Sequence, residues 1–268
     1  MLANGRESML VEIDPVRDAV GGMPMDPKPT FVLIHGAWHG GWCWQRLAPM
    51  LRAAGYETYT PTLTGLGERA HLLNPAIDLS THITDVLNLL EYDDLSDVIL
   101  VGHSYGGMVV SALVEQVPDR IAQAIYLDAF LPENGESIRD IGTPGLDEIA
   151  ATYGDGWRMP PTMPAADFGV SDPDDAAWVD ARIGDQPYGT FTQPITLTGA
   201  GESIPKAFIL CTEFLFPPHA ERARQRGFVV RDLKGGGHDC MVTIPDQLAT
   251  MLLELATSAT HQPAVIMS

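Results

Sequence analysis

The sequence predicts an α/β fold in which helices cover a mainly parallel central sheet on both faces. Two observations predict this fold. Short apolar runs, several of them ending in glycine, alternate along the chain with longer segments that carry apolar residues at helical spacing, and this alternation is typical of β-α-β units. One apolar run, DVILVG at residues 97–102, is almost continuously apolar, as expected for a strand buried on both faces of a parallel sheet.

The composition is that of an ordinary globular chain. Its 268 residues, 45% of them hydrophobic, are enough for one large domain with a substantial core. A formal net charge of -19 is expected to repel nucleic acid and anionic membranes, and we interpret it as a charge that favours solubility. We therefore expect no nucleic-acid partner and no membrane partner.

The start of the chain and its cysteines favour a cytoplasmic protein. No apolar stretch approaches the roughly 20 residues of a membrane-spanning helix, and the first residues lack the basic start and apolar run of a secretory signal. Cys43, Cys211 and Cys240 are too few and too widely spaced for a disulfide framework or a paired metal-ligand motif. A reducing cytoplasm is the default compartment for such a chain.

The elements expected in the first half follow one another with short connections. Residues 1–28 are expected to form an N-terminal extension, and their glycines and prolines predict no definite element there. After it, apolar runs predict strands and segments with an apolar stripe predict helices, the second of them capped by Ser80 or Thr81. The expected strands are 30–36, 56–63, 97–102 and 124–130, and the expected helices are 42–55, 78–92 and 106–117.

The alternation stops after Leu131 and resumes at Lys206. Residues 132–205 are rich in Pro, Gly and Asp and carry scattered aromatic residues, which predicts an inserted cap rather than part of the sheet. The core is therefore expected over residues 29–131 and 206–268. Its second part carries the expected strands 206–212 and 228–233 and the expected helices 217–227 and 244–257.

The stretch GHSYG predicts that Ser104 is a nucleophile. A strand is expected before it and a helix after it, and Gly102, Gly106 and Gly107 leave room for a strained turn between the two. The amino end of the helix favours negative charge that develops at the serine. A structural turn serine is the alternative, but the strand-turn-helix context favours the nucleophile.

A serine hydroxyl needs a base, and His238 is the expected one. It lies in the loop KGGGHDC directly after the last expected strand, and reactive groups gather at the carboxyl ends of parallel strands. A histidine on a surface loop is the alternative reading. His103 lies inside the turn and is expected to point away from the reaction. The other histidines are expected to flank the first loop (His35 and His39) or to lie on the surface (His71, His82, His219 and His261).

The negative charge of a tetrahedral intermediate needs preorganised donors. The N–H of Tyr105, the residue after Ser104, is one expected donor. The loop HGAWHGGW follows the first strand and is expected to supply the second donor, the N–H of Ala37. A flexible glycine loop without this role is the alternative.

Four motifs together resemble the α/β-hydrolase superfamily. They are FVLIHGAWHGGWCWQRL, PTLTGLGER, VILVGHSYGG and GGGHDCM. More narrowly, they are similar to bacterial esterases related to the plant methylesterase and hydroxynitrile lyase group. The resemblance covers about residues 30–131 and 206–257, and it implies the α/β-hydrolase fold with an inserted cap and a serine reaction, but no particular substrate.

The acid that orients the base departs from the plant group. In that group the acid usually follows the strand that here reads FILCT, and the comparable position holds Phe214. We expect Asp128 instead, because some α/β-hydrolases carry their acid after the preceding strand and a buried aspartate needs a partner. A turn cap is the other reading of Asp128. Glu213 is the alternative acid, and Asp239 or no acid at all are also open.

Two further departures bear on the reaction. Hydroxynitrile lyases carry a lysine directly after the catalytic histidine and a threonine in the first loop, and here these positions hold Asp239 and Gly36. The positive charge that would bind cyanide is missing, so ester hydrolysis fits better than cyanohydrin cleavage. Peroxidase or dioxygenase activity without a cofactor also occurs on this fold and stays open.

We therefore expect a serine hydrolase that cleaves a small to medium uncharged carboxylic ester through an acyl-enzyme intermediate and needs no cofactor. A metal site from His35, His39 and His238 has no supporting ligand spacing, so no metal is expected. The alternatives are a receptor-like α/β-hydrolase that binds a small molecule with little turnover, and a lyase or C–C hydrolase with the same triad. A homodimer is left open. The expected pocket aromatics, unless the cap uses its own as a small core, are Trp38, Trp157, Phe168, Trp178 and Phe191.

Overall fold

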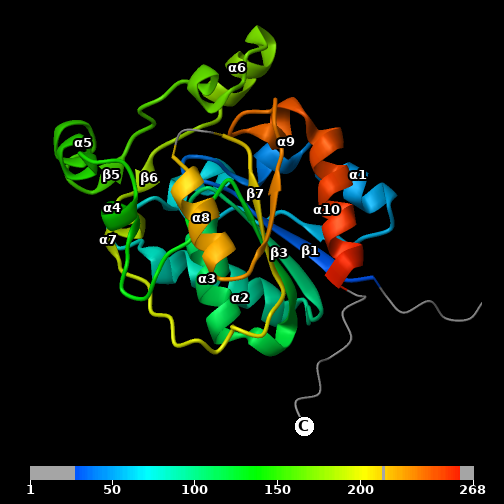
Figure 1. The fold of residues 1–268 in the computed structure, drawn as a ribbon. Helices are drawn as coiled ribbons and strands as arrows, with labels where there is room; N and C mark the ends of the chain where they lie inside the picture. The colour runs from blue at the N-terminus through cyan, green and yellow to red at the C-terminus, as the bar shows by residue number, and fades with distance from the viewer. Residues whose placement is uncertain (1–27, 213–214, 260–268) are drawn as a thin grey trace, which may run out of the picture.

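Six parallel strands form the central sheet in the order β2-β1-β3-β4-β7-β8, with helices on both faces (Figure 1). The structure is a computed structural model that describes residues 28–212 and 215–259. The predicted fold class is thereby confirmed. The strands are β1 (Thr30–Ile34), β2 (Thr58–Tyr59), β3 (Val98–His103), β4 (Ile121–Leu127), β7 (Lys206–Leu210) and β8 (Val229–Asp232).

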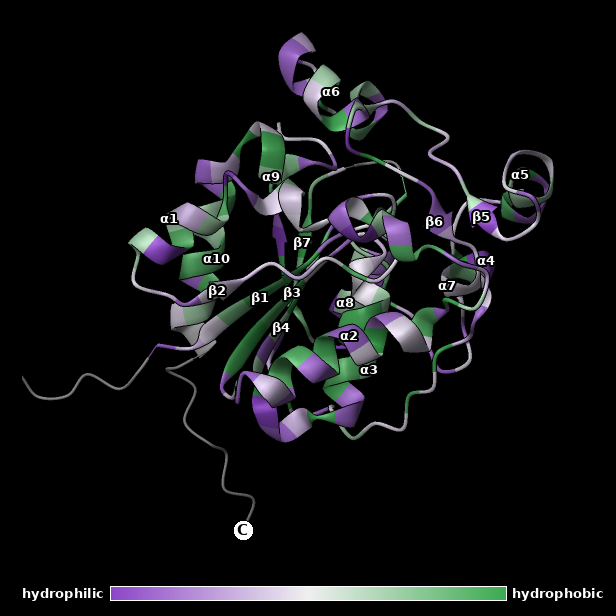
Figure 2. Cartoon of the chain, turned by 180° about the vertical axis from the view of Figure 1, so that it is seen from behind, coloured by the Kyte–Doolittle hydropathy of each residue, from purple (hydrophilic) through white to green (hydrophobic). Residues whose placement is uncertain are grey.

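The strands contribute side chains alternately to two core layers. In β1, Val32 and Ile34 belong to one layer and Phe31 and Leu33 to the other, as the two-residue period of a strand requires. Three helices close each layer, and Figure 2 shows their apolar sides turned to the sheet. The first layer is closed by α2 (Leu79–Tyr92), α3 (Gly106–Gln116) and α8 (Pro217–Gln225), and the second by α1 (Ala48–Ala53), α9 (Cys240–Thr243) and α10 (Pro245–Ala259).

The segment between β4 and β7 adds no strand to the central sheet. Its two short strands pair with each other in antiparallel register and with no strand of the described central sheet. Short helices surround this pair and reach over the carboxyl ends of the strands (Figure 1). The elements of the segment are α4 (Ile138–Ile141), α5 (Leu146–Tyr153), β5 (Arg158–Met159), η4 (Ala165–Phe168), α6 (Pro173–Asp180), β6 (Gln186–Pro187) and α7 (Gly189–Thr192).

The helix expected over 42–55 is wrong in extent. The chain instead forms a 3-10 turn, η1 (Gly41–Trp44), followed by the six-residue helix α1. Pro49 explains the break, because proline lacks the N–H of a helical hydrogen bond and is tolerated only in the first turn, where it stands in α1. Two further 3-10 turns, η2 (Gly67–Leu72) and η3 (Pro118–Arg120), connect other elements.

Three other boundaries also differ from the sequence prediction. Only Thr58 and Tyr59 of the expected strand 56–63 pair with β1. The cap of α2 is Asp78 rather than Ser80 or Thr81: its carboxylate accepts the N–H of Thr81 at 2.9 Å. Strand β4 ends at Leu127, so that Asp128 is the first residue beyond the strand.

No described helix is both long enough and apolar enough to span a bilayer.

Candidate active site

Ser104 lies at a sharp turn between β3 and α3. Its φ of 53° is in the left-handed region that residues with a side chain rarely adopt. The turn is tied to the end of β4, because the N–H of Ser104 donates to Leu127 and its carbonyl accepts from Phe130. Helix α3 approaches this loop so closely that a Cβ on Gly107 would lie 2.1 Å from the carbonyl oxygen of Phe130. The local backbone thus holds the Ser104 hydroxyl out from the sheet.

Asp128 and His238 are joined by a hydrogen bond. The Nδ1 of His238 lies 2.8 Å from Oδ2 of Asp128, whose side chain is fully buried. The carboxylate also accepts the N–H of Cys211 at 2.9 Å and both the N–H and the hydroxyl of Thr212, at 3.2 and 2.9 Å. These donors satisfy the buried charge. A carboxylate at Nδ1 favours the tautomer with a proton on Nδ1, which leaves Nε2 free to accept one.

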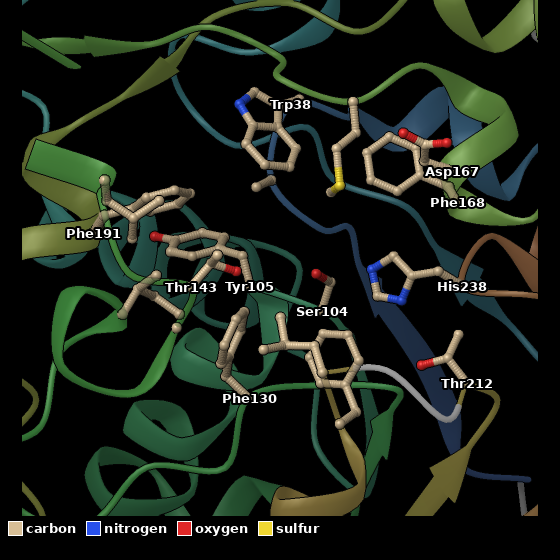
Figure 3. Close-up of a pocket in the computed structure, with 17 residues that line it drawn as sticks. Trp38, Ser104, Tyr105, Phe130, Thr143, Asp167, Phe168, Phe191, Thr212 and His238 are labelled. Carbon is tan, nitrogen blue, oxygen red and sulfur yellow. The ribbon is translucent and has the colours of Figure 1, made fainter. Parts of the chain in front are cut away.

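The Ser104 hydroxyl and the His238 ring face each other across the end of the sheet (Figure 3). No hydrogen bond joins these two side chains in the structure, and such bonds often form only with substrate bound. The His238 ring stacks on Phe216, with ring centroids 4.9 Å apart and an interplanar angle of 6°. The Nε2 of His103 lies 3.0 Å from the backbone carbonyl of His238 and also holds this loop.

The alternative acid, Glu213, and the neighbouring Phe214 lie outside the described residues. Thr212 was not among the expected site residues, although it is the last residue of the strand expected over 206–212. Strand β7 ends at Leu210, so Thr212 lies two residues beyond it, and its hydroxyl and N–H both reach the carboxylate of Asp128 at the end of the adjacent strand β4.

The loop after β1 lies directly against the Ser104 turn. The N–H groups of Ala37 and Tyr105 have no acceptor among the hydrogen bonds of the described residues, so both are free to bind an oxyanion. His35 fixes the start of the loop, since its Nδ1 lies 2.8 Å from the carbonyl of Gly36 and its Nε2 accepts the N–H of Leu63 at 3.0 Å. Burial lowers the pKa of His35 to about 3, so this histidine stays neutral.

Trp38 anchors the same loop to the segment between β4 and β7. Its φ of 65° is strained for a tryptophan. Its backbone N–H donates to Oε1 of Gln186 at 3.2 Å, and its indole N–H donates to the carbonyl of Met159 at 2.9 Å. The overlying segment therefore helps to hold the loop that carries the N–H of Ala37.

Replacing Gly36 with alanine is expected to lower kcat/KM about 100-fold, the cost of a displacement of about 1 Å in an active site. A Cβ at this position would lie 2.9 Å from both Nδ1 of His103 and Cβ of Ser104, so the loop or the turn must shift. Steady-state ester hydrolysis measures the loss. Gly184→Ala is the matched control, because its Cβ meets nothing within 4 Å. Equal activities of the two variants would contradict this prediction.

A cavity of about 410 Å³ opens at the Ser104 hydroxyl (Figure 3). Of the expected aromatic residues, Trp38, Phe168 and Phe191 line it. Trp157 and Trp178 do not: the Trp178 ring packs edge-on against another tryptophan at 5.1 Å, and Trp157 lies under the guanidinium of Arg158. The cavity is also lined by residues that were not expected from the sequence. Most of them are apolar and lie on loops and short helices: Phe130, Ile138, Leu146, Met163, Leu215 and Phe216.

The charge of the cavity wall is negative rather than neutral. Asp167 lines the cavity, and its carboxylate forms no hydrogen bond or ion pair with another described residue. No lysine or arginine is among the described lining residues. Thr143 and Thr212 are the other polar side chains of the wall away from Ser104, Tyr105 and His238.

Two histidines expected at the surface are buried. The Nδ1 of His82 lies 2.9 Å from the hydroxyl of Tyr105 and its Nε2 2.9 Å from the carbonyl of Thr64, because this side of α2 faces α3. Burial lowers the pKa of His82 to about 4. His219 accepts the N–H of Leu131 through Nδ1 at 3.2 Å. Within the described ranges, no three His, Cys, Asp or Glu residues are grouped so that they could hold a metal ion.

Comparisons with known proteins identify a family and several similar chains. The model of the alpha/beta hydrolase family matches residues 31–251. The chain is 39% identical over 246 residues to a carbendazim hydrolyzing esterase of Nocardioides sp. (strain SG-4G), covering 84% of this chain and 99% of that one. It is 28% identical over 254 residues to salicylic acid-binding protein 2 of Nicotiana tabacum, covering 84% and 96%.

Solved structures give the same picture. An extracellular alpha/beta-hydrolase from a Paenibacillus species, described as sharing structural and functional homology with the tobacco protein, superposes with a TM-score of 0.72 at 27% identity, covering 85% of this chain and 98% of that one. A variant of tomato methylketone synthase I with bound beta-ketoheptanoate superposes with a TM-score of 0.74 at 22% identity, covering 87% and 98%, which shows the shared fold.

Proposed function

Because the chain belongs to the alpha/beta hydrolase family, we propose that it is a carboxylic ester hydrolase with Ser104 as nucleophile, His238 as base and Asp128 as acid. One observation carries the proposal: the buried carboxylate of Asp128 holds Nδ1 of His238 at 2.8 Å while the ring faces the strained serine. The esterase that is 39% identical over nearly its whole length supports ester hydrolysis as the type of reaction.

The reaction follows from the roles of these groups. His238 takes the proton of the Ser104 hydroxyl through Nε2 as the oxygen attacks the ester carbonyl. The N–H groups of Ala37 and Tyr105 hold the negative oxygen of the tetrahedral intermediate. His238 then protonates the leaving alcohol, and water, activated by the same histidine, cleaves the acyl-enzyme.

The substrate proposed is an uncharged or cationic ester of small to medium size. A cavity of about 410 Å³ is within the range of small-molecule sites, and its wall is mostly apolar and aromatic. The carboxylate of Asp167 repels a negative charge on the substrate, and no described cationic side chain of the wall compensates it. A free carboxylate on the acyl group therefore weakens binding.

The test is steady-state hydrolysis of a p-nitrophenyl ester series: acetate, butyrate, octanoate and the anionic hemisuccinate. We expect steady turnover of the neutral esters and a lower kcat/KM for the hemisuccinate. Asp167→Asn is expected to raise the hemisuccinate value about threefold to tenfold relative to butyrate, since two unit charges near solvent interact by about 1 kcal/mol. Asp174→Asn, on the exposed first turn of α6 and outside the cavity wall, is the control.

Two outcomes count against these claims. If the wild type hydrolyses none of these esters, or stops after one stoichiometric burst, the esterase proposal is overturned. If the hemisuccinate is turned over as well as butyrate by the wild type, the role of Asp167 is wrong while the esterase proposal stands.

A further inference from the structure

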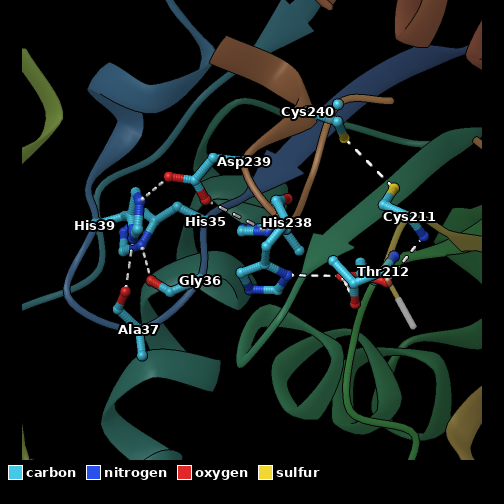
Figure 4. Close-up of polar contacts among 12 residues, drawn as sticks. His35, Gly36, Ala37, His39, Cys211, Thr212, His238, Asp239 and Cys240 are labelled. Atoms are coloured by element: carbon cyan, nitrogen blue, oxygen red, sulfur yellow. Dashed lines mark hydrogen bonds and ion pairs between the residues drawn. The ribbon is translucent and has the colours of Figure 1, made fainter. Parts of the chain in front are cut away.

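His39 and Asp239 form a second buried histidine–carboxylate contact beside the candidate triad. The Nε2 of His39 lies 3.1 Å from Oδ2 of Asp239, and their side chains are only 2% and 0% exposed. Figure 4 shows the Asp239 carboxylate directed at His39, although Asp239 directly follows His238 in the chain. The proposed reaction uses neither residue, so the contact needs another explanation.

The surroundings of His39 favour a charged ring. Its Nδ1 lies 2.7 Å from the carbonyl oxygen of Ala37, which can only accept a hydrogen bond. Its Nε2 faces a carboxylate. A neutral imidazole has one N–H, so it would leave a lone pair against an oxygen, whereas the imidazolium donates to both. Burial by itself lowers the pKa of His39, but the charge of Asp239 and the hydrogen bonds outweigh it and raise this pKa.

The contact connects loops that are far apart in the sequence. His39 belongs to the loop that carries the N–H of Ala37, and Asp239 to the loop that carries His238. The backbone N–H of Asp239 also donates to the carbonyl of Phe168, which lines the cavity. The imidazole is held flat against Trp42, with ring centroids 5.1 Å apart at 20°. A displacement of either partner is thus transmitted to the other loop.

We propose that the ion pair of His39 and Asp239 fixes the position of the oxyanion-binding N–H of Ala37 relative to the base His238. The inference rests on the proposed function, because it concerns the same reaction. His39 and Asp239 do not touch the substrate. They act by holding the two loops at the separation that the tetrahedral intermediate needs, so their loss acts on kcat rather than on KM.

The other titratable groups that face the pair do not change charge near neutral pH. One lies directly after β1, and the other two lie on β3 and η1. Burial lowers the pKa of His35 to about 3. Burial and the neighbouring His238 hold the pKa of His103 well below its ordinary value. Burial and Asp239 raise the pKa of the Cys43 thiol well above its ordinary value. If the separation of the two loops changes at alkaline pH, the cause is therefore the loss of the His39 proton.

The direction of the pH effect follows from the raised pKa. The attraction of the ion pair is fully present below the ordinary histidine pKa of about 6.5 and is lost as the pH rises through the higher pKa of His39 in the folded protein. The rate should therefore fall on the alkaline side as His39 loses its proton, which gives the pH profile an alkaline limb.

The experiment compares the wild type with Asp239→Asn and His39→Gln in the intact protein. We expect kcat for p-nitrophenyl butyrate to fall about 100-fold, with KM changed less than about threefold, and the alkaline limb to disappear in both variants. The rate at which a fluorophosphonate labels Ser104 should fall in parallel, because it needs the same nucleophile, base and oxyanion donors. Leu252→Ala, which truncates a fully buried residue of α10, is the control for lost stability, and it should keep the alkaline limb.

A measurement on the wild type covers the case in which the variants do not fold. The nitrogen chemical shifts of the His39 ring should be those of an imidazolium at a pH of about 7, where an ordinary histidine is mostly neutral. A neutral ring at that pH overturns the proposal, as does an unchanged kcat or a retained alkaline limb in folded variants. Failure of the proposed function is distinct: the wild type itself would then show neither turnover nor Ser104 labelling.

Discussion

Replacing Ser104 with alanine is expected to lower kcat for p-nitrophenyl butyrate about a millionfold, the size of the loss when a serine nucleophile is removed from a comparable triad. The variant lacks the oxygen that forms the acyl-enzyme, while the oxyanion donors and the cavity stay in place. Turnover in the presence of excess ester, with intact-mass detection of the acylated protein in the wild type, measures the effect. KM for residual activity should change little, because the cavity wall is not altered.

Ser111→Ala is the matched control for this loss. Ser111 is also a buried serine and lies in α3, but its hydroxyl lies between the carbonyl of Gly107 and the hydroxyl of Tyr126 and does not line the cavity. This variant should stay within about tenfold of the wild type, because it removes only two hydrogen bonds, each worth about 1 kcal/mol, and no group at the candidate site. Full activity in Ser104→Ala would mean that another group performs the reaction.

Replacing Asp128 with asparagine is expected to lower kcat about 10⁴-fold, as the loss of the correct histidine tautomer does in a serine triad. The backbone N–H groups of Cys211 and Thr212 both point at Oδ1 and will keep the amide oxygen there. The amide nitrogen then faces Nδ1 of His238 and forces the proton onto Nε2. In this tautomer the base cannot take the proton of the serine.

Glu213→Gln serves as the control in the same assay, because Glu213 is the competing candidate for the acid. We expect it to keep wild-type kcat. A large loss in Glu213→Gln together with an active Asp128→Asn would assign the acid to Glu213. Melting temperatures of both variants are needed beside the kinetics, since the fully buried Asp128 also accepts three hydrogen bonds from the chain after β7.

The periodic features of the fold could be predicted from the sequence because they depend on local patterns. The continuous apolar run before Ser104 became β3, and the stripe of Ile83, Val86 and Leu90 became the buried side of α2. The ends of helices and strands were harder to predict, since they depend on single hydrogen bonds. Asp78 rather than Ser80 caps α2 because its carboxylate accepts the N–H of Thr81. This contact depends on side-chain geometry, which residue propensities for helix caps do not describe.

The residues of the cavity wall could be predicted only in part, for a related reason. Trp38 follows a strand whose end is evident in the sequence, and it lines the cavity as expected. Trp157 and Trp178 are in a segment with no periodic pattern, and both pack against arginines away from the cavity. Irregular segments have no repeat that reports which side faces inward, so the position of their side chains depends on contacts with distant parts of the chain.

By itself, the sequence determined the order of strands and helices, the turn that carries Ser104 and the loop that carries His238, because each depends on residues that are neighbours in the chain. Only the tertiary structure decided which carboxylate meets which histidine. Asp128 and Asp239 both lie near strand ends, yet the first binds His238 and the second binds His39. The reason is that parallel strands distant in sequence end at one edge of the sheet, and the packing there brings each of the two buried carboxylates within hydrogen-bond distance of a different histidine.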